Sequence, residues 1–367
     1  MISGKRSFLT GLLVVLLLAF SGVATAQDSG DSESLTIGRT DGSEWSNNGE
    51  FDTPFGVAVD NAGNVYVADT NNHQIQKFTS NGTFVTQWQS IGSGIGELHS
   101  LPYGIAVDRS GTVYVADLYF HRITTFTSDG TFLTQWGRKG SGNGEFDAPS
   151  AVAVGGSGTV YVADTGNHRI QTFTSDGTYL TEWGAEWFGD GKLDSPSGVA
   201  VDGSGNVYVA DTGDDLIRKF TSDGTFVTKW QAIGSGIGKL SSLPYGVAVD
   251  DSDNVYVTDM YNGRIQVFTS DGTFLGQWGS RGSGEGEFTT PLGIAVDRSG
   301  TIYVADTNNN RIQTFKRSDV LPASSGNVTH SGSTPPPTSS PGSVIVVISG
   351  IMIVALAAGV VLPIRKN

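Results

Sequence analysis

The sequence predicts an all-β protein: a six-bladed β-propeller of four-stranded antiparallel blades. Three observations predict this fold. One phrase recurs six times at spacings of 47 or 48 residues, a period typical of propeller blades. Each unit holds four short runs of strand-forming residues separated by turns rich in Gly, Asp and Asn. Glycine is very frequent, at 51 residues, but only 12 prolines accompany it, which favours short strands with tight turns over disorder.

The N-terminus has the pattern of a secretory signal. Two basic residues precede an apolar run, and an A-T-A motif ending at Ala26 offers a cleavage site. We expect residues 1–26 to be removed and residues 27–33 to form a short linker. Loss of Lys5 and Arg6 changes the formal charge from −14 to −16, since 20 basic and 36 acidic residues remain. An acidic chain repels phosphate backbones, so nucleic acid is not an expected partner.

Each of six units, which we number as blades 1–6, begins at a proline. The consensus is approximately P-x-G-V-A-V-D-x-S-G-x-V-Y-V-A-D-T-x-N-x-R-I-Q-x-F-T-S-D-G-T-F-x-T-Q-W-G. The six prolines are Pro54, Pro102, Pro149, Pro196, Pro244 and Pro291. A fixed period of this length indicates similar sheets repeated around an axis.

Blade 1 illustrates how a unit divides into strands. The expected strands are Gly56–Val59, Val65–Ala68, Gln74–Phe78 and Thr83–Trp88. The segments 60–64 and 79–82 are turns, because Asp and Asn side chains bond nearby backbone groups and Gly supplies positive φ. The second and third strands alternate hydrophobic and polar residues, whereas the first is small and apolar on both faces.

Blade 6 lacks the fourth strand of its unit. Its repeat ends at Phe315, and the segment G-T-F-x-T-Q-W is missing. We expect the N-terminal strand Leu35–Ile37 to complete this blade, because Ile37 stands where Trp136 stands in blade 2. The propeller would then comprise residues 34–316. Closure of this kind removes the sheet edges that otherwise invite aggregation.

Three segments that follow V-A-D-T carry a resemblance to a known family. They are N-N-H-Q-I (71–75), G-N-H-R-I (166–170) and N-N-N-R-I (308–312). With six units in phase, the chain resembles the NHL-repeat family over residues 34–316. The resemblance implies a six-bladed propeller. It implies little about function, because such propellers serve as protein-binding modules, RNA binders, sensor domains of membrane kinases and, in one branch, an amidating lyase.

A second symmetry relates blades that are three apart. Residues 88–108 and 230–250 differ at only four positions, and the prolines of blades 1 and 4, 2 and 5, and 3 and 6 are each 142 residues apart. Blades three apart lie opposite each other in a ring of six. We therefore infer a duplication of three blades and expect approximate two-fold symmetry.

Two sets of side chains suggest metal binding. His73, His121 and His168 occupy one position in blades 1–3, and three His would suit zinc. Neighbouring blades are too far apart for Zn–N bonds of about 2.0–2.1 Å, so we assign these His to turns. An Asp ends the second strand of every blade, which would suggest calcium. An acid present in every blade is explained more simply as a turn cap that pairs with a nearby Arg. These residues are Asp69, Asp117, Asp164, Asp211, Asp259 and Asp306.

Another Asp precedes the first turn of each blade except blade 3, where Gly155 replaces it, and we expect the same capping role. This set is Asp60, Asp108, Asp202, Asp250 and Asp297.

The inner strands read G-V-A-V, G-I-A-V or A-V-A-V and offer no acid, His or Asn to the channel. We therefore expect no catalytic residue, no metal and no cofactor, and we predict that the protein is not an enzyme.

Blades 2 and 5 depart from the consensus at one face. The segment V-Y-V-A-D-L-Y-F-H-R-I (113–123) and its opposite partner V-Y-V-T-D-M-Y-N-G-R-I (255–265) replace polar turn residues by apolar ones. Exposed apolar clusters often mark interaction sites, and aromatic residues anchor them. We predict a ligand-binding patch of Tyr103, Leu118, Tyr119, Phe120, Tyr245, Met260 and Tyr261. The alternative is local packing, in which Tyr103 and Tyr245 cover the channel mouth over Leu118 and Met260.

Three segments follow the propeller. Residues 317–343 form a Ser/Thr/Pro/Gly linker. Residues 344–364 are uncharged, mostly apolar and long enough to be a transmembrane helix, and the basic residues of the tail 365–367 favour a cytoplasmic C-terminus. We expect a single-pass protein of the cell membrane with the propeller outside. The alternative is a sorting signal whose tail is removed. Sequons at Asn81 and Asn327 would accept glycans in a host that glycosylates them.

The expected function is non-enzymatic: a cell-surface binding or scaffold protein that presents its propeller to extracellular protein or peptide ligands. The first alternative is a glycan- or cell-envelope-binding module, because Tyr, Trp and Asn/Asp turns suit sugars. The second alternative is a metal-dependent propeller lyase or lactonase.

Overall fold

The computed structural model describes residues 36–37, 48–89, 100–185, 189–231 and 243–320. The predicted signal, membrane span and cytoplasmic tail lie outside these residues, as do Leu35 and Asn327. Within the described part of the chain, no helix is both long and apolar enough to cross a membrane.

Blades 1–3 each contain four strands, as predicted. Blade 1 contains β2 (Pro54–Val59), β3 (Val65–Asp69), β4 (Gln74–Phe78) and β5 (Phe84–Gln89). Blade 2 contains β6 (Pro102–Val107), β7 (Val113–Asp117), β8 (Arg122–Phe126) and β9 (Phe132–Trp136). Blade 3 contains β10 (Pro149–Val154), β11 (Val160–Asp164), the 3₁₀ turn η1 (Thr165–Asn167), β12 (Arg169–Phe173) and β13 (Tyr179–Trp183).

Blades 4–6 repeat the arrangement. Blade 4 contains β14 (Pro196–Val201), β15 (Val207–Asp211), η2 (Thr212–Asp214), β16 (Leu216–Phe220) and β17 (Phe226–Gln231). Blade 5 contains β18 (Pro244–Val249), β19 (Val255–Asp259), β20 (Arg264–Phe268) and β21 (Phe274–Trp278), followed by the short pair β22 (Ser280–Arg281) and β23 (Glu287–Phe288). Blade 6 contains β24 (Pro291–Val296), β25 (Thr301–Asp306), η3 (Thr307–Asn309) and β26 (Arg311–Lys316), joined by β1 (Thr36–Ile37).

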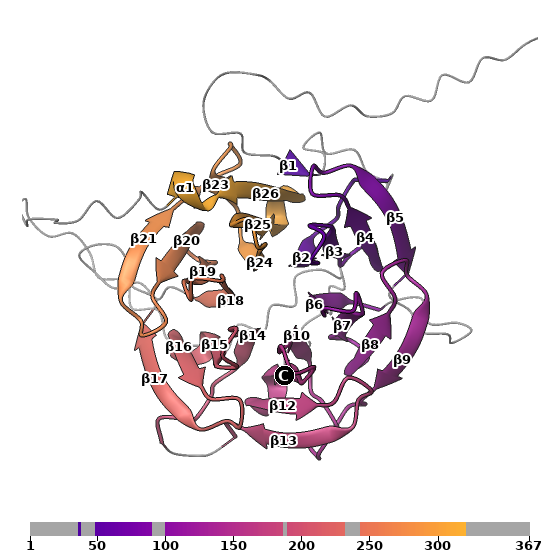
Figure 1. Ribbon diagram of the computed structural model, residues 1–367, viewed down its shortest axis with the longest axis vertical. Helices are drawn as coiled ribbons and strands as arrows, with labels where there is room; N and C mark the ends of the chain where they lie inside the picture. The colour runs from indigo at the N-terminus through magenta and orange to yellow at the C-terminus, as the bar shows by residue number, and fades with distance from the viewer. Residues whose placement is uncertain (1–35, 38–47, 90–99, 186–188, 232–242, 321–367) are drawn as a thin grey trace, which may run out of the picture. The chain divides into compact units, whose positions relative to one another are not determined.

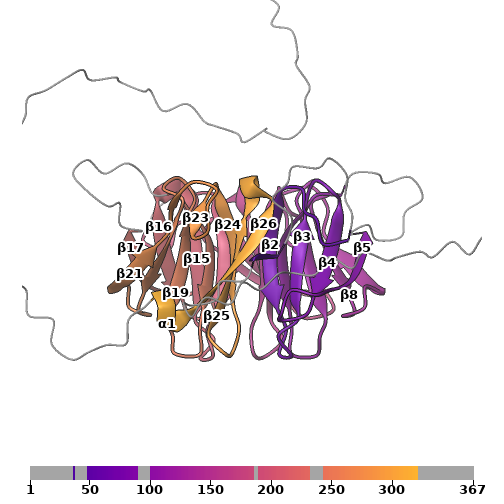
Figure 2. The same cartoon turned by 90° about the horizontal axis from the view of Figure 1, so that it is seen from above.

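The six antiparallel sheets surround a common axis with the first strand of each blade innermost (Figure 1). Seen from the side, the strands run between two faces that carry the turns (Figure 2). The prediction of a six-bladed propeller with four-stranded blades is therefore confirmed.

The predicted ring closure is also confirmed for the residues described. β1 pairs with β26 through Thr36↔Gln313 and Ile37↔Ile312. Ile37 thus occupies the place that Trp136 occupies opposite Ile123 in blade 2. The Ile37 side chain is buried beside Ile312 and Phe51, so the N-terminal strand contributes to the core as well as to the sheet.

The hydrophobic core lies between blades. At the junction of blades 3 and 4, Tyr161 and Trp183 of one blade pack with Leu193 and Phe220 of the next. Similar clusters fill the other five junctions of the ring. The indole of Trp183 covers Gly224, where an added Cβ would lie 2.6 Å from the ring and where φ is +88°. The D-G turn between the third and fourth strands therefore requires its glycine for packing and for backbone conformation.

A short helix, α1 (Arg317–Val320), follows β26 within the predicted linker. Val320 packs against the core at the junction of blades 5 and 6. Arg317 pairs with Asp250 at 3.2 Å and donates to Ser252 Oγ at 2.8 Å, both in blade 5. The C-terminal end of the described chain is therefore fixed to a second blade.

Candidate binding site at the mouth of the ring

The Asp that ends each second strand is a structural cap. Asp164, which is fully buried, accepts the backbone N–H of Asp147 at 2.7 Å and pairs with Arg169 Nε at 2.7 Å. Equivalent Arg–Asp pairs occur in blades 2, 5 and 6, whereas Gln74 replaces the Arg in blade 1. The predicted turn cap is confirmed, and its pairing with the Arg after the turn holds in blades 2, 3, 5 and 6.

The three aligned His residues are structural too, and His73 Nδ1 hydrogen-bonds the backbone carbonyl of Ser100 at 2.6 Å. His121 and His168 accept the backbone N–H of Ala148 and Ser195 of the next blade at 2.9 and 3.0 Å. Both adopt the left-handed conformation, with φ near +55°. Asn310 does the same in blade 6, where its side-chain oxygen accepts from Thr53 at 2.9 Å. Among the described residues, no three His, Cys, Asp or Glu side chains are grouped closely enough to hold a metal ion.

The Asp that precedes the first turn caps that turn and accepts a tyrosine hydroxyl. Asp202 accepts the backbone N–H of Ser204 and Asn206 and the hydroxyl of Tyr208 at 3.1 Å. Gly155 removes this acceptor from blade 3, as expected from the sequence. These turns surround a cavity of about 180 Å³ at that end of the axis, lined also by Arg109 and Asp251.

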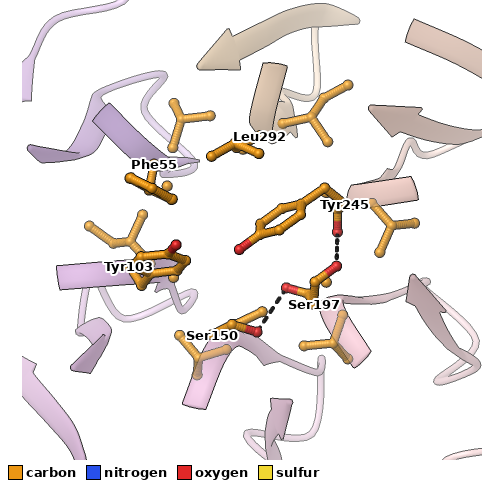
Figure 3. A pocket seen from close by; sticks show the side chains of 18 residues that line it. Phe55, Tyr103, Ser150, Ser197, Tyr245 and Leu292 are labelled. Carbon is orange, nitrogen blue, oxygen red and sulfur yellow. Dashed lines mark hydrogen bonds between the residues drawn. The ribbon is translucent and has the colours of Figure 1, made fainter. Parts of the chain in front are cut away.

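The opposite end of the axis opens into a smaller cavity, which we call the mouth. Its rim consists of the residues that follow the six prolines, namely Phe55, Tyr103, Ser150, Ser197, Tyr245 and Leu292 (Figure 3). The cavity volume is about 80 Å³. This is less than the roughly 150 Å³ of an engineered cavity that encloses benzene, so the mouth suits a single small group.

The rim has a polar side and an apolar side. Phe55 and Tyr103 stack with ring centroids 4.0 Å apart, and Leu292 extends this apolar wall in blade 6. Ser150 and Ser197 form the facing polar wall, and the Tyr245 hydroxyl points across the mouth toward Tyr103 (Figure 3). Burial raises the pKa of Tyr103 to about 12 and holds the pKa of Tyr245 well above 10, so both hydroxyls stay protonated at neutral pH.

Sequence profiles of known families match several parts of this chain. The profile described as "NHL repeat" matches residues 51–78, 146–173 and 193–220, which are the first three strands of blades 1, 3 and 4 and the residues that lead into them. The profile described as "6-bladed beta-propeller" matches residues 239–320. The chain is a six-bladed β-propeller with NHL repeats in blades 1, 3 and 4. No curated protein sequence matches it.

Solved structures similar to this NHL-repeat propeller include enzymes. A catalytically inactive virginiamycin B lyase from Staphylococcus aureus with quinupristin has a TM-score of 0.52 and 17% identity, covering 77% of this chain and 87% of that one. A gluconolactonase from Xanthomonas campestris has a TM-score of 0.57 and 18% identity, covering 78% and 90%. At this identity the likeness concerns the fold.

The predicted patch residues of the propeller lie on one face but in two settings. Strand register places Tyr103 beside the turn 118–121, through Pro102↔Asp117, and places Tyr245 beside its counterpart through Pro244↔Asp259. Tyr103 and Tyr245 point into the mouth. The phenol rings of the turns face solvent, with exposed fractions of 58% for Tyr119 and 46% for Tyr261. Leu118, Phe120 and Met260 are half-buried below them, and Arg122 lies over the Phe120 ring at 4.8 Å.

Sequence reasoning missed the hydroxyl groups that join neighbouring blades at the mouth. In four blades the Thr after the capping Asp donates to the carbonyl of the proline that starts the next blade. These bonds are Thr70–Pro102 (2.7 Å), Thr165–Pro196 (2.8 Å), Thr212–Pro244 (2.6 Å) and Thr307–Pro54 (2.8 Å). The signal was present as the Thr of V-A-D-T, but the pattern alone does not show which carbonyl the hydroxyl reaches.

The His121→Asn variant is expected to be less sensitive to acid than the native protein. Burial lowers the pKa of His121 below 6.5, so the unfolded chain binds a proton that the folded chain rejects, and stability falls as the pH drops through 6.5. Protonation also removes the bond from Ala148, which is worth about 1 kcal/mol. Asn, which serves natively at position 310, keeps the acceptor without titrating. Melting curves from pH 7 to pH 5 test this, and parallel curves for both proteins would contradict it.

Proposed function

We propose that this propeller is a non-enzymatic binding module that holds an extracellular protein or peptide ligand on the face that carries the mouth. One observation carries the proposal: the aromatic residues of opposite blades gather on this face. Tyr119 and Tyr261 are exposed there, whereas Tyr103 and Tyr245 reach the mouth. Exposed aromatic side chains beside a small cavity are typical anchors of protein interfaces.

The size of the mouth supports a macromolecular ligand. A cavity of about 80 Å³ accepts one side chain or end group, and the remaining contacts would come from the turns around it. The proposal includes the predicted anchor: residues 344–364 would hold the propeller outside the cell membrane, and the predicted linker would separate the two. A glycan remains the alternative ligand, because exposed tyrosine rings also stack on sugars.

Selection from a random peptide display library against the full chain tests the proposal. Peptides that bind the native protein should lose about tenfold or more in affinity for the Tyr119→Ser/Tyr261→Ser variant, since central aromatic anchors contribute most of the binding energy. The matched control is Val85→Ser/Leu180→Ser, which removes two side chains of similar exposure, 47% and 49%, from outer strands. The control should bind as the native protein does.

Three results would count against the proposal. Equal binding by the tyrosine variant and the control would show that the aromatic face is not the site. Binding to a glycan array without enrichment of any peptide would favour the glycan module. A melting temperature that falls on addition of a chelator would revive the metal-dependent lyase or lactonase.

A further inference from the structure

The polar wall of the mouth offers hydrogen-bond acceptors to a ligand, because its own hydroxyl hydrogens already bond to other groups of the protein. Ser150 Oγ donates to the carbonyl of Ser197 at 3.1 Å, and Ser197 Oγ donates to the carbonyl of Tyr245 at 3.0 Å. Thr165 Oγ1 lies 2.6 Å from Ser150 Oγ and 2.8 Å from the carbonyl of Pro196, so the single hydrogens of these two hydroxyls are both used within the wall. A hydroxyl has one hydrogen and two lone pairs. A ligand that meets these serines must therefore donate.

The junction of blades 2 and 3 adds further acceptors. At five of the six junctions a side-chain hydroxyl donates to a carbonyl at the start of the next blade. In four it reaches the proline, and in blade 5 Thr258 donates to Leu292 at 2.9 Å. Blade 2 has Ala116 and Leu118 at the two positions that supply such hydroxyls. Among the described residues, no side-chain donor reaches the carbonyls of Pro149 or Ser150.

Glycine keeps this junction open. Ser150 O lies 2.6 Å from the point where a Cβ on Gly104 would stand, so no side chain from blade 2 covers it there. Gly104, Ser150 and Tyr103 all line the mouth. Ser150 and the stacked rings of Phe55 and Tyr103 thus border the same small cavity.

We propose, on the basis of the proposed function, that the mouth binds the side chain of a lysine on the peptide or protein partner. An ammonium group has three donors and no acceptor, which matches the polar wall of Ser150 and Ser197, whose hydroxyl hydrogens are already used. The methylene stem of lysine would lie along Phe55, Tyr103 and Leu292, as lysine stems do on apolar surfaces. The formal charge of −14 favours a cationic ligand.

Calorimetric titration of the full chain tests the chemistry of the ligand. The probes are short peptides blocked at both ends that differ only in a central lysine, acetyl-lysine, norleucine or arginine. The lysine peptide should bind at least about tenfold tighter than the acetyl-lysine and norleucine peptides, because charge-assisted hydrogen bonds are the strong ones. Equal binding by any of the other three peptides would overturn the assignment to an ammonium group.

The Leu118→Thr variant tests where on the propeller the lysine side chain binds. It installs the residue found in four other blades, so its hydroxyl should donate to the carbonyl of Pro149, raise the melting temperature and weaken lysine-peptide binding severalfold. Met260→Thr, in the opposite blade, should leave binding unchanged, because the rim carbonyl at that junction, that of Leu292, already accepts from Thr258. Ser150→Ala should also weaken binding, and full affinity in both Leu118→Thr and Ser150→Ala would overturn the site.

Two outcomes separate this inference from the proposed function. Library peptides that bind the aromatic face irrespective of lysine acetylation would overturn the lysine site and leave the binding module standing. Butylamine that binds as tightly as the lysine peptide would confirm the ammonium site but remove the peptide from the proposed function.

Discussion

The Arg169→Ala variant is expected to lose about 3–5 kcal/mol of unfolding free energy, because it leaves a buried carboxylate without its charged partner. Asp164 is fully buried, and the exposed fraction of Arg169 is 4%. The same guanidinium donates to the carbonyls of Ser141, Gly142 and Glu145 at 2.9 Å. Its loss therefore releases the connection between blades 2 and 3 as well as the strand end.

Thermal and denaturant unfolding measure this loss, with a drop in melting temperature of roughly 5–10 °C. The matched control is Arg138→Ala in the same connection, whose ion pair with Glu145 involves a side chain that is 81% exposed. It should cost less than about 1 kcal/mol. Arg169→Gln should recover part of the loss, because Gln74 bonds the equivalent Asp69 at 2.8 Å in blade 1. Similar losses for Arg169→Ala and Arg138→Ala would contradict the buried-pair argument.

The Ile37→Ala variant is expected to destabilise the propeller by about 2–5 kcal/mol and to promote aggregation. Ile37 is 4% exposed and packs between blades 6 and 1, and β1 contributes only two described residues to its pairing with β26. Weakening this strand frees the outer edge of β26, which then offers unpaired backbone groups to another molecule.

Unfolding curves and light scattering at several protein concentrations check this expectation. Val85→Ala on the outer strand of blade 1 is the control; its side chain is 47% exposed, so the change should stay within about 0.5 kcal/mol. An Ile37→Ala protein as stable and as monodisperse as this control would show that closure does not depend on the N-terminal strand.

The architecture could be predicted from the sequence because the same four-strand pattern recurs in six units. The period, the four strands per unit and the missing strand of blade 6 each follow from aligned residues, and Ile37 was placed correctly by its match to Trp136. The roles of His121 and Asp164 followed from the same logic, since a residue repeated in several blades must serve something that each blade needs.

The site could be predicted only in part, because repetition shows which residues are equivalent but not which ones touch. Phe55 and Tyr103 belong to different blades and are 48 residues apart, yet they stack at the mouth. The stretch at 118–120 was singled out as an aromatic departure. The same stretch also lacks the hydroxyl that joins a blade to the next one. The sequence does not show this, because it becomes clear only from the bonds that Thr70 and Thr165 make to the following blades. The patch as a ligand site stays a prediction.

Ring closure also sets the order in which the protein can finish folding. Thr36 pairs with Gln313, so one of the first strands to be synthesised waits for one of the last. Contacts of such long sequence separation form slowly. Five blades contain all their strands in one continuous segment and can assemble as the chain emerges, whereas blade 6 must wait for an N-terminal strand that has stayed unpaired throughout. The final step of folding is therefore expected to be the pairing of β1 with β26. A chaperone that shields this short apolar segment would increase the rate at which closed rings form.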